Sequence, residues 1–199
     1  PGGSGSTDVR LLLASRNAHK VAELRRMEPG IDWVTMPADL EDPPETGETF
    51  EHNALEKAEF VSRATGAWVL ADDSGLEVRA LGGQPGVRSK RYSLEGTDEA
   101  NNQRLLAAMQ GEQDRSARYR CVLALVGPAG KFTAEGACEG TIGDAPRGNG
   151  GFGYDPLFWP GAVPGRTMAQ LSPAEKDAVS HRGVAMRKLP ALLARAGLR

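Results

Sequence analysis

The sequence of 199 residues has few cysteines, few aromatic residues and little net charge. Its two cysteines, Cys121 and Cys138, lack the C-x-x-C spacing of metal and redox sites, so we expect free thiols in a reducing cytoplasmic setting. The 24 basic and 26 acidic residues leave a net charge of −2. Without a basic surface or a stripe of basic and aromatic residues, a role in holding nucleic acid is disfavoured.

No hydrophobic run approaches the ~18 residues of a membrane span, so we expect no membrane association. The opening PGGSGS has no basic region followed by an apolar one, which argues against a signal peptide. We interpret residues 1–7 as a flexible tail or an expression remnant. Residues 8–199 have the composition of a globular protein, without repeats or a clear boundary, and are predicted to form one domain.

Short apolar runs alternate with helical patterns, which is typical of α/β proteins. A capping box with proline at the first helical position begins at Ser172, and Pro190 is expected to kink or interrupt the last helix. The predicted strands are 9–14, 31–36, 67–71, 118–126 and 132–141, and the predicted helices are 21–27, 50–66, 98–109 and 183–196.

The polar segment Ser15–Lys20 follows the first predicted strand and precedes a helix. Free N–H groups and the helix dipole favour an anion at such a place, and Ser15, Asn17 and Lys20 would add donors. The G-x-x-x-x-G-K pattern is absent, so this is not a Walker loop. The alternative is a plain helix cap with a solvated lysine.

Asp72 and Asp73 follow an apolar strand and precede Ser74. Adjacent carboxylates repel one another unless a cation compensates, and Mg²⁺ prefers oxygen ligands. The alternative is an Asp-rich turn. Glu45 and Lys57 are candidates to join this group, although each alone is more typical of a solvated surface.

Two further segments carry groups suited to a purine base. In the segment 152–156, Phe152 can stack on a planar ring and Asp155 can pair with ring N–H groups, although a core aromatic beside a tight turn is equally compatible. Lys176, His181 and Arg182 can donate to exocyclic oxygens, and their alternative is an ordinary surface.

Seven ordered motifs together resemble the inosine triphosphate pyrophosphatase family, whose members are also called dITP/XTP pyrophosphatases. The resemblance covers about residues 9–193. The motifs are S-x-N-x-x-K at 15–20, E-T-G-x-T-F-x-x-N-A-x-x-K-A at 45–58, A-D-D-S-G-L at 71–76, L-G-G-x-P-G-V at 81–87, R-Y-S at 91–93, G-G-F-G-Y-D-P at 150–156 and S-H-R-G at 180–183.

This resemblance implies an α/β fold with a long, curved mixed β-sheet flanked by helices, in two lobes around a central substrate cleft. It implies a homodimer that uses Mg²⁺ to hydrolyse ITP, dITP and XTP to the monophosphate and pyrophosphate. Such a reaction keeps deaminated purines out of nucleic acid.

The resemblance also implies roles for individual residues. Asp73 and Asp72 would be catalytic, with the choice of base between them open, and Asp73, Glu45 and Asp72 would hold the metal. The implied substrate-binding residues are Ser15, Arg16, Asn17, Ala18, His19, Lys20, Lys57, Ser74, Phe152, Gly153, Tyr154, Asp155, Lys176, His181 and Arg182, of which Arg16 and His19 occupy variable positions and have no specific role.

Two positions depart from the family pattern. Pro44 stands where relatives often carry a second acid, which removes one possible metal ligand. Arg88 stands where relatives often have an aromatic residue.

Purine selectivity would depend on position 6, which is an oxygen acceptor in inosine and xanthosine and an amino donor in adenosine. Because Lys176, His181 and Arg182 are donors, adenine would leave two donors facing each other. We expect Arg182→Ala to lose ITP preference more than stability. Two alternatives stay open: an enzyme for other nucleotides, such as modified pyrimidine triphosphates, and a nucleotide-binding module without catalysis.

Overall fold

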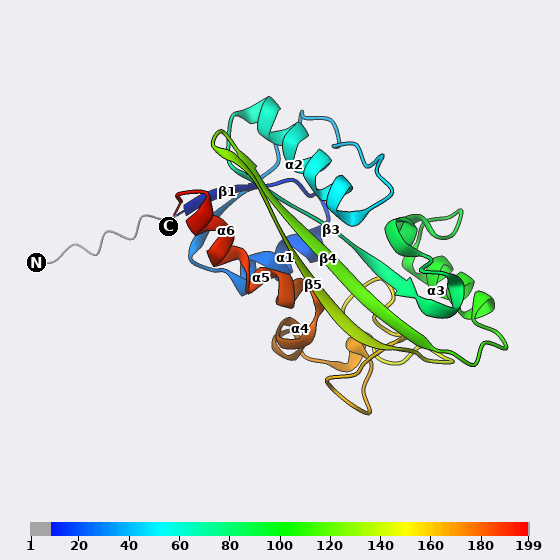
Figure 1. The fold of residues 1–199 in the computed structure, drawn as a ribbon. Coiled ribbons are helices and arrows are strands. Elements are labelled where there is room, and N and C mark those ends of the chain that lie inside the picture. The colour runs from blue at the N-terminus through cyan, green and yellow to red at the C-terminus, as the bar shows by residue number, and fades with distance from the viewer. Residues whose placement is uncertain (1–8, 199) are drawn as a thin grey trace, which may run out of the picture.

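The computed structural model describes residues 9–198, so the tail interpreted at residues 1–7 lies outside the described residues. One sheet of six strands has the order β2-β1-β3-β4-β5-β6 (Figure 1). β1 pairs in parallel with β2 and β3, and the remaining pairs are antiparallel, which confirms the expected mixed sheet. The strands are β1 (Val9–Leu13), β2 (Ile31–Thr35), β3 (Val69–Val78), β4 (Ser116–Gly127), β5 (Gly130–Ile142) and β6 (Phe158–Pro160).

Helices cover both faces of this sheet. Within residues 9–198, the α-helices are α1 (Ala18–Met27), α2 (Phe50–Thr65), α3 (Asp98–Ala108), α4 (Pro173–Val179), α5 (His181–Met186) and α6 (Leu189–Arg195). Three short 3-10 helices are η1 (Arg79–Leu81), η2 (Gly86–Arg91) and η3 (Met168–Gln170). No helix in the described range is long and apolar enough to cross a membrane.

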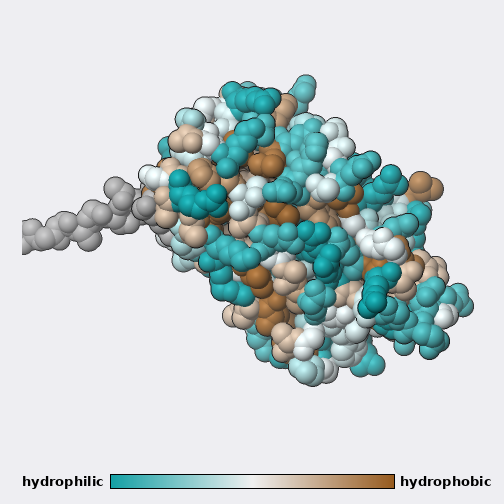
Figure 2. Space-filling model, viewed as in Figure 1, coloured by the Kyte–Doolittle hydropathy of each residue, from teal (hydrophilic) through white to brown (hydrophobic). Residues whose placement is uncertain are grey.

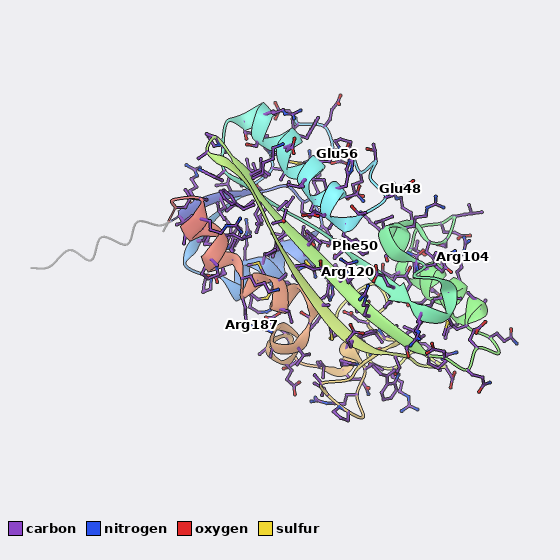
Figure 3. The ribbon with its side chains drawn as sticks, in the orientation of Figure 1. Glu48, Phe50, Glu56, Arg104, Arg120 and Arg187 are labelled. Atoms are coloured by element: carbon purple, nitrogen blue, oxygen red, sulfur yellow. The ribbon has the colours of Figure 1, made fainter. Side chains whose placement is uncertain are left out.

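The hairpin of β4 and β5 runs as a long curved ribbon through the molecule and connects its two ends (Figure 1). α2 packs on one face, where Ala54, Ala58 and Val61 meet Val122 and Ala124 of β4. At the start of α2, Phe50 lies beside Arg120 of β4 (Figure 3), with the guanidinium 5.6 Å from the ring centroid.

The opposite face packs against α1, α5 and α6, through a cluster that includes Leu24, Leu123 and Leu189. A third hydrophobic cluster occupies the far end of the sheet, where Leu105 of α3 meets Leu76 of β3. The outer surface is mostly hydrophilic on the side drawn in Figure 2, and hydrophobic residues form separate spots there. Hydrophobic clusters thus occupy both faces and the far end of the sheet.

Local chemistry sets several of the predicted boundaries. The Thr49 side chain accepts from the His52 amide at the start of α2, and the helix ends at Gly66, whose φ is 68°. The predicted capping box of Ser172 and Glu175 is present at α4. These signals act within one helical turn, which explains why the sequence predicts them well.

Some predicted boundaries were wrong, such as the start of α1, which lies at Ala18 and not at residue 21. The strand predicted at 67–71 continues to Val78, so Asp72 and Asp73 lie within β3 and not after it. The helix predicted at 183–196 is interrupted near Pro190, as expected: α5 ends at Met186, and Pro190 stands in the first turn of α6.

A close approach between α5 and β5 depends on Gly136. A Cβ at this position would lie 2.2 Å from the His181 carbonyl oxygen and 2.3 Å from the Ala185 nitrogen. Any other residue would therefore push α5 away from the sheet. The glycine lets the helix carry His181 and Arg182 directly over β4.

Candidate active site

The site lies where β3 extends beyond the end of β1. β1 pairs with β3 only at Leu12 and Leu13, and β3 then continues through Asp72 and Asp73. The N-terminus of α1 faces this extension. Ligands of open α/β sheets commonly bind in such a crevice at the carboxyl ends of parallel strands.

Strand alternation sends Asp72 and Asp73 to opposite faces of the sheet. Asp72 is paired with Leu123, which belongs to the core below α5 and α6, whereas Asp73 is paired with Val122, which packs below α2. Successive side chains of a strand point in opposite directions. The two carboxylates therefore have separate sets of partners.

Asp72 is surrounded by donors. Its Oδ2 accepts from Lys20 Nζ at 3.0 Å, from Arg182 Nη2 at 3.1 Å and from Ser74 Oγ at 3.3 Å. Burial alone would raise the pKa of this carboxyl, but Lys20, Arg182 and Lys57 hold the pKa far below its ordinary value. Asp72 is thus a stable anion whose charge is already compensated.

Asp73 has fewer partners and faces the cleft. Its Oδ1 accepts from Lys57 Nζ at 3.2 Å and its Oδ2 from Asn53 Nδ2 at 3.1 Å. Burial raises the pKa of Asp73, and Lys57 and Lys20 offset only part of that effect. A carboxylate with a raised pKa accepts a proton more readily than an ordinary aspartate.

Lys57 joins Asp73 to Glu45. Its Nζ lies 2.9 Å from Glu45 Oε1, and it is buried in the wall formed by α2. Burial would lower the pKa of Lys57, but the charges of Asp73, Asp72 and Glu45 raise it, so the ammonium stays charged. Asn53 stands one turn earlier on α2, and both side chains point to β3 as their four-residue spacing predicts.

The oxygen donors fit a divalent cation that is only partly held by protein. Within residues 9–198, no group of three or more His, Cys, Asp or Glu residues is placed to hold a metal. Glu45 and Asp73 nevertheless lie on either side of one lysine and both line the cleft. Mg²⁺ usually takes one or two carboxylates and completes its shell with water and phosphate oxygens.

A polar pocket adjoins Lys20 at the start of α1. Asn17 caps the helix, since its Oδ1 accepts from the amides of His19 at 3.0 Å and Lys20 at 3.3 Å. Of the predicted segment, Ser15, Arg16, Asn17 and Lys20 line this pocket, whereas Ala18 does not. Lys57 and Glu45 line it as well, together with Lys90 and Arg91.

Lys90 and Arg91 belong to η2, and sequence reasoning missed them. Arg91 belongs to the R-Y-S motif at 91–93, but the spacing of this motif does not indicate that Arg91 would share a pocket with Lys20. Arg16 is turned toward Asp42, with Arg16 Nε 2.7 Å from Oδ1, and it also donates to the Leu40 carbonyl.

The second part of the cleft brings together the predicted base-binding residues. Lys176 Nζ lies 2.6 Å from Asp155 Oδ2 and 2.8 Å from Glu23 Oε1. Arg182 Nη1 donates to the other Glu23 oxygen at 2.6 Å. Glu23, a buried acid of α1 that the sequence did not single out, therefore joins the two cations. The cleft is lined by Phe152, Gly153, Tyr154, Asp155, Lys176, His181 and Arg182, with His19, Lys20, Asp73 and Ser74.

Two buried atoms in this part of the cleft lack a hydrogen-bond partner, His181 Nδ1 and Arg182 Nε. Burial, with the charges of Arg182 and Lys176, holds the pKa of His181 well below its ordinary value, so its ring is neutral at pH 7. Buried polar groups without partners are unfavourable and rare. His181 and Arg182 both line the cleft, so a ligand bound there would lie beside these groups.

The Phe152 ring stands among these groups. It stacks on His19 with 5.2 Å between ring centroids, and Lys176 Nζ lies 4.5 Å from its centroid. Tyr154 is anchored differently, since its hydroxyl donates to the Ser89 carbonyl at 2.7 Å. The structure thus gives Phe152 an aromatic face at the cleft and gives Tyr154 a supporting contact.

Comparisons with known proteins agree with this architecture. The family model described as "Ham1 family" matches residues 11–192. A dITP/XTP pyrophosphatase of Mycolicibacterium paratuberculosis is 52% identical over 94% of this chain and 98% of its own length, and one of Nocardia farcinica is 52% identical over 94% and 97%.

Solved structures show the same relationship. The Ham1 protein of Staphylococcus aureus has a TM-score of 0.84 and 39% identity, over 94% of this chain and 99% of its own. The dITP/XTP pyrophosphatase of Mycobacterium abscessus has a TM-score of 0.74 and 46% identity, over 93% and 99%. The resemblance found in the sequence is confirmed, and the chain belongs to the Ham1 family.

Proposed function

We propose that this protein hydrolyses the deaminated purine nucleoside triphosphates ITP, dITP and XTP to the monophosphate and pyrophosphate. One observation carries the proposal: a single cleft joins the unpartnered donor of Arg182 to the carboxylates of Asp73 and Glu45. The relatives named dITP/XTP pyrophosphatase support the same reaction. The reaction would clear such nucleotides from the precursor pool.

Asp73 is our choice for the general base. A water oxygen attacks the α-phosphorus and gives its proton to Asp73, while the bond from that phosphorus to the bridging oxygen breaks and pyrophosphate leaves. The raised pKa of Asp73 suits a proton acceptor, and Asn53 and Lys57 orient its carboxylate. Asp72, with a depressed pKa and an oxygen shared by three donors, is better suited to hold Lys20 and Arg182 in position.

The polar pocket at α1 is the proposed place of the triphosphate. Ser15, Asn17 and Lys20 would bind phosphate oxygens beside the helix N-terminus, and Lys57 would assist from α2. Asp73 and Glu45 would hold Mg²⁺, which, when bound, neutralises phosphate charge. Lys90 and Arg91 add positive charge to the same pocket.

The base would occupy the part of the cleft beside Phe152. Hypoxanthine and xanthine present an oxygen at position 6, which can accept from a buried donor such as Arg182 Nε. Adenine presents an amino group at this position, so that amino group and Arg182 Nε, which are both donors, would lack an acceptor. Such a mismatch discriminates strongly. Phe152 would stack on the ring, and Asp155 would face its N–H groups.

The remaining expectations belong to this proposal. We expect residues 8–199 to act as one two-lobed domain and the protein to work as a homodimer in the cytoplasm. Light scattering after size exclusion would measure the assembly, and a mass of one chain at micromolar concentration would contradict the dimer.

The direct test measures pyrophosphate release from ITP, dITP, XTP, GTP and ATP, with Mg²⁺ and with EDTA. We expect rapid Mg²⁺-dependent release from the first three and little from GTP and ATP. Asp73→Asn should lose turnover by about 10²–10⁴-fold, the usual contribution of a positioned base. Its matched control is Asp32→Asn, an exposed carboxylate on β2 that lies outside the cleft.

Each of the other outcomes would favour a different function for this protein. Equal cleavage of all five substrates would refute the base assignment and leave the phosphate chemistry. Preference for modified pyrimidine triphosphates would favour the related-enzyme alternative. Binding of ITP without pyrophosphate release would favour the non-catalytic module, and near-normal turnover of Asp73→Asn would exclude this residue as the base.

A further inference from the structure

The base-binding segment is held by α3, a helix whose Leu105 packs in the same hydrophobic cluster as Tyr154. The Gly153 amide donates to Asp98 Oδ2 at 2.6 Å, and the Gly153 carbonyl accepts from Asn102 Nδ2 at 2.9 Å. Asp98 and Asn102 are four residues apart and so lie on one face of the helix. Together they bind both polar groups of a single residue, and this pair is called the Gly153 clamp below.

Gly153 directly follows Phe152, so the clamp acts next to the ring that faces the cleft. The glycine has a φ of 62°, in the left-handed region, and needs external support to hold one geometry. Within the turn, the Phe152 amide donates to Asp155 Oδ2 at 3.0 Å, and other segments hold the Tyr154 hydroxyl and the Asp155 carboxylate. The clamp adds the two contacts that fix the backbone of Gly153 itself, and both come from α3.

Asn102 carries a further signal. Its Oδ1 is buried and has no hydrogen-bond partner. A buried oxygen without a partner is unfavourable, and an apolar side chain of similar size would avoid it. The stability of α3 alone therefore does not explain an asparagine at this position, whereas the hydrogen bond from Asn102 to the Gly153 carbonyl does.

The same helix turn also supports the phosphate side of the cleft. Asn101 accepts from the Ser93 amide at 2.7 Å and donates to the Lys90 carbonyl at 3.1 Å. One turn of α3 thus contacts the backbone beside Phe152 and the backbone of Lys90, which lines the polar pocket at α1.

We propose that Asp98 and Asn102 are positioning residues that hold Phe152 in the geometry that receives the purine base. Neither residue needs to touch the base for this role. The inference rests on the proposed function, because it assigns the base to the Phe152 side of the cleft. It goes further by placing part of the base affinity in a helix that the site motifs do not include.

The clamp should affect the affinity for the base and not for the phosphates. Asp98→Ala and Asn102→Leu should each raise the KM for ITP about five- to tenfold, the effect of one hydrogen bond, while kcat changes less than twofold. Inhibition by pyrophosphate, which has no base, should keep its wild-type constant. Asn102→Leu should unfold near the wild-type temperature, because removal of the unpartnered oxygen offsets loss of the bond to the Gly153 carbonyl.

Matched controls come from the same turn of α3. Glu99→Ala removes a first-turn acid as Asp98→Ala does, and Gln103→Ala shortens the residue after Asn102. Both side chains are exposed and contact one another and not the loop. Both controls should keep the wild-type KM. The double variant Asp98→Ala with Asn102→Leu should cost less than the product of the single effects, since both act on Gly153.

A second measurement does not depend on catalysis. Hydrogen exchange of the amides in residues 148–155 should accelerate in both clamp variants, while exchange in α2 stays unchanged. Unchanged exchange in that segment would overturn the clamp, whatever the activity. A KM for ITP that stays at the wild-type value, or a pyrophosphate constant that rises in step with it, would overturn its role toward the base. Wild-type protein that fails to cleave ITP would instead refute the proposed function.

Discussion

Arg182→Ala is expected to destabilise the protein strongly, whereas the sequence alone predicted a loss of ITP preference larger than the loss of stability. Arg182 is 1% exposed and joins α5 to two acids on other elements. It lies 2.6 Å from Glu23 Oε2, 3.1 Å from Asp72 Oδ2 and 2.9 Å from Ser74 Oγ. Removing one member of a buried ion pair leaves a buried charge less compensated, at a cost of about 3–5 kcal/mol.

The lower end of that range applies here, because each acid keeps another cation. Glu23 retains Lys176 at 2.8 Å, and Asp72 retains Lys20 at 3.0 Å. We therefore expect a loss of about 3 kcal/mol in the free energy of unfolding. For a chain of this size, that corresponds to a melting temperature lowered by about 6–12 °C.

Urea and thermal denaturation followed by circular dichroism would measure this loss. Arg187→Ala is the matched control, because Arg187 follows α5 but is exposed and donates only to the Ala178 carbonyl, at 3.1 Å (Figure 3). The control should melt within about 2 °C of the wild type. Adding Glu23→Gln to Arg182→Ala should recover part of the loss, since it removes one of the stranded charges. A drop below about 3 °C for Arg182→Ala would refute the reasoning from buried charge.

Three further predictions concern the same site. Asp73→Asn should melt at or above the wild-type temperature despite its lost turnover. Burial raises the pKa of Asp73, so the ionised form of this residue opposes folding above about pH 4. Calorimetry at pH 7 would check this, and a large drop in melting temperature would contradict it. His181 has a depressed pKa, so its contribution is complete above about pH 6.5 and is lost as the pH falls, by up to about 1.4 kcal/mol per pH unit. The melting temperature of His181→Gln should therefore fall less between pH 7 and 5 than that of the wild type, and parallel curves would exclude this assignment. Glu45→Gln should raise the Mg²⁺ concentration needed for half-maximal pyrophosphate release by about tenfold and leave the KM for ITP at saturating Mg²⁺ nearly unchanged; an unaltered Mg²⁺ titration would remove Glu45 from the metal site.

The sequence predicted the elements whose signals are local. Thr49 and Gly66 mark the ends of α2 through contacts within one turn, and the alternation of apolar runs with helical patterns indicates an α/β protein. The sequence was less reliable for elements whose extent depends on pairing with distant segments. The extension of β3 through Asp72 depends on pairing with β4, which begins about 40 residues later in the chain.

The residues of the candidate site show the same difference between local and long-range signals. Lys176 and Arg182 were predicted from motifs, but Glu23, which lies between them, resembled one more surface acid of an amphipathic helix. Its partner Arg182 is 159 residues away in sequence, so no local pattern could reveal the contact. Asp98 and Asn102 escaped notice for the same reason, because their partner is the backbone of a loop about 50 residues away.

By itself, the sequence determined the fold class, the family and which side chains are available for phosphate and base. Apolar periodicity, caps and ordered motifs are written in neighbouring residues, so they can be read without the fold. Only the tertiary structure decided how those side chains divide their work. The pleat of β3 turns Asp72 toward Lys20 and Arg182 and turns Asp73 toward Lys57 and Asn53, and long-range packing then compensates one carboxylate and leaves the other with a raised pKa.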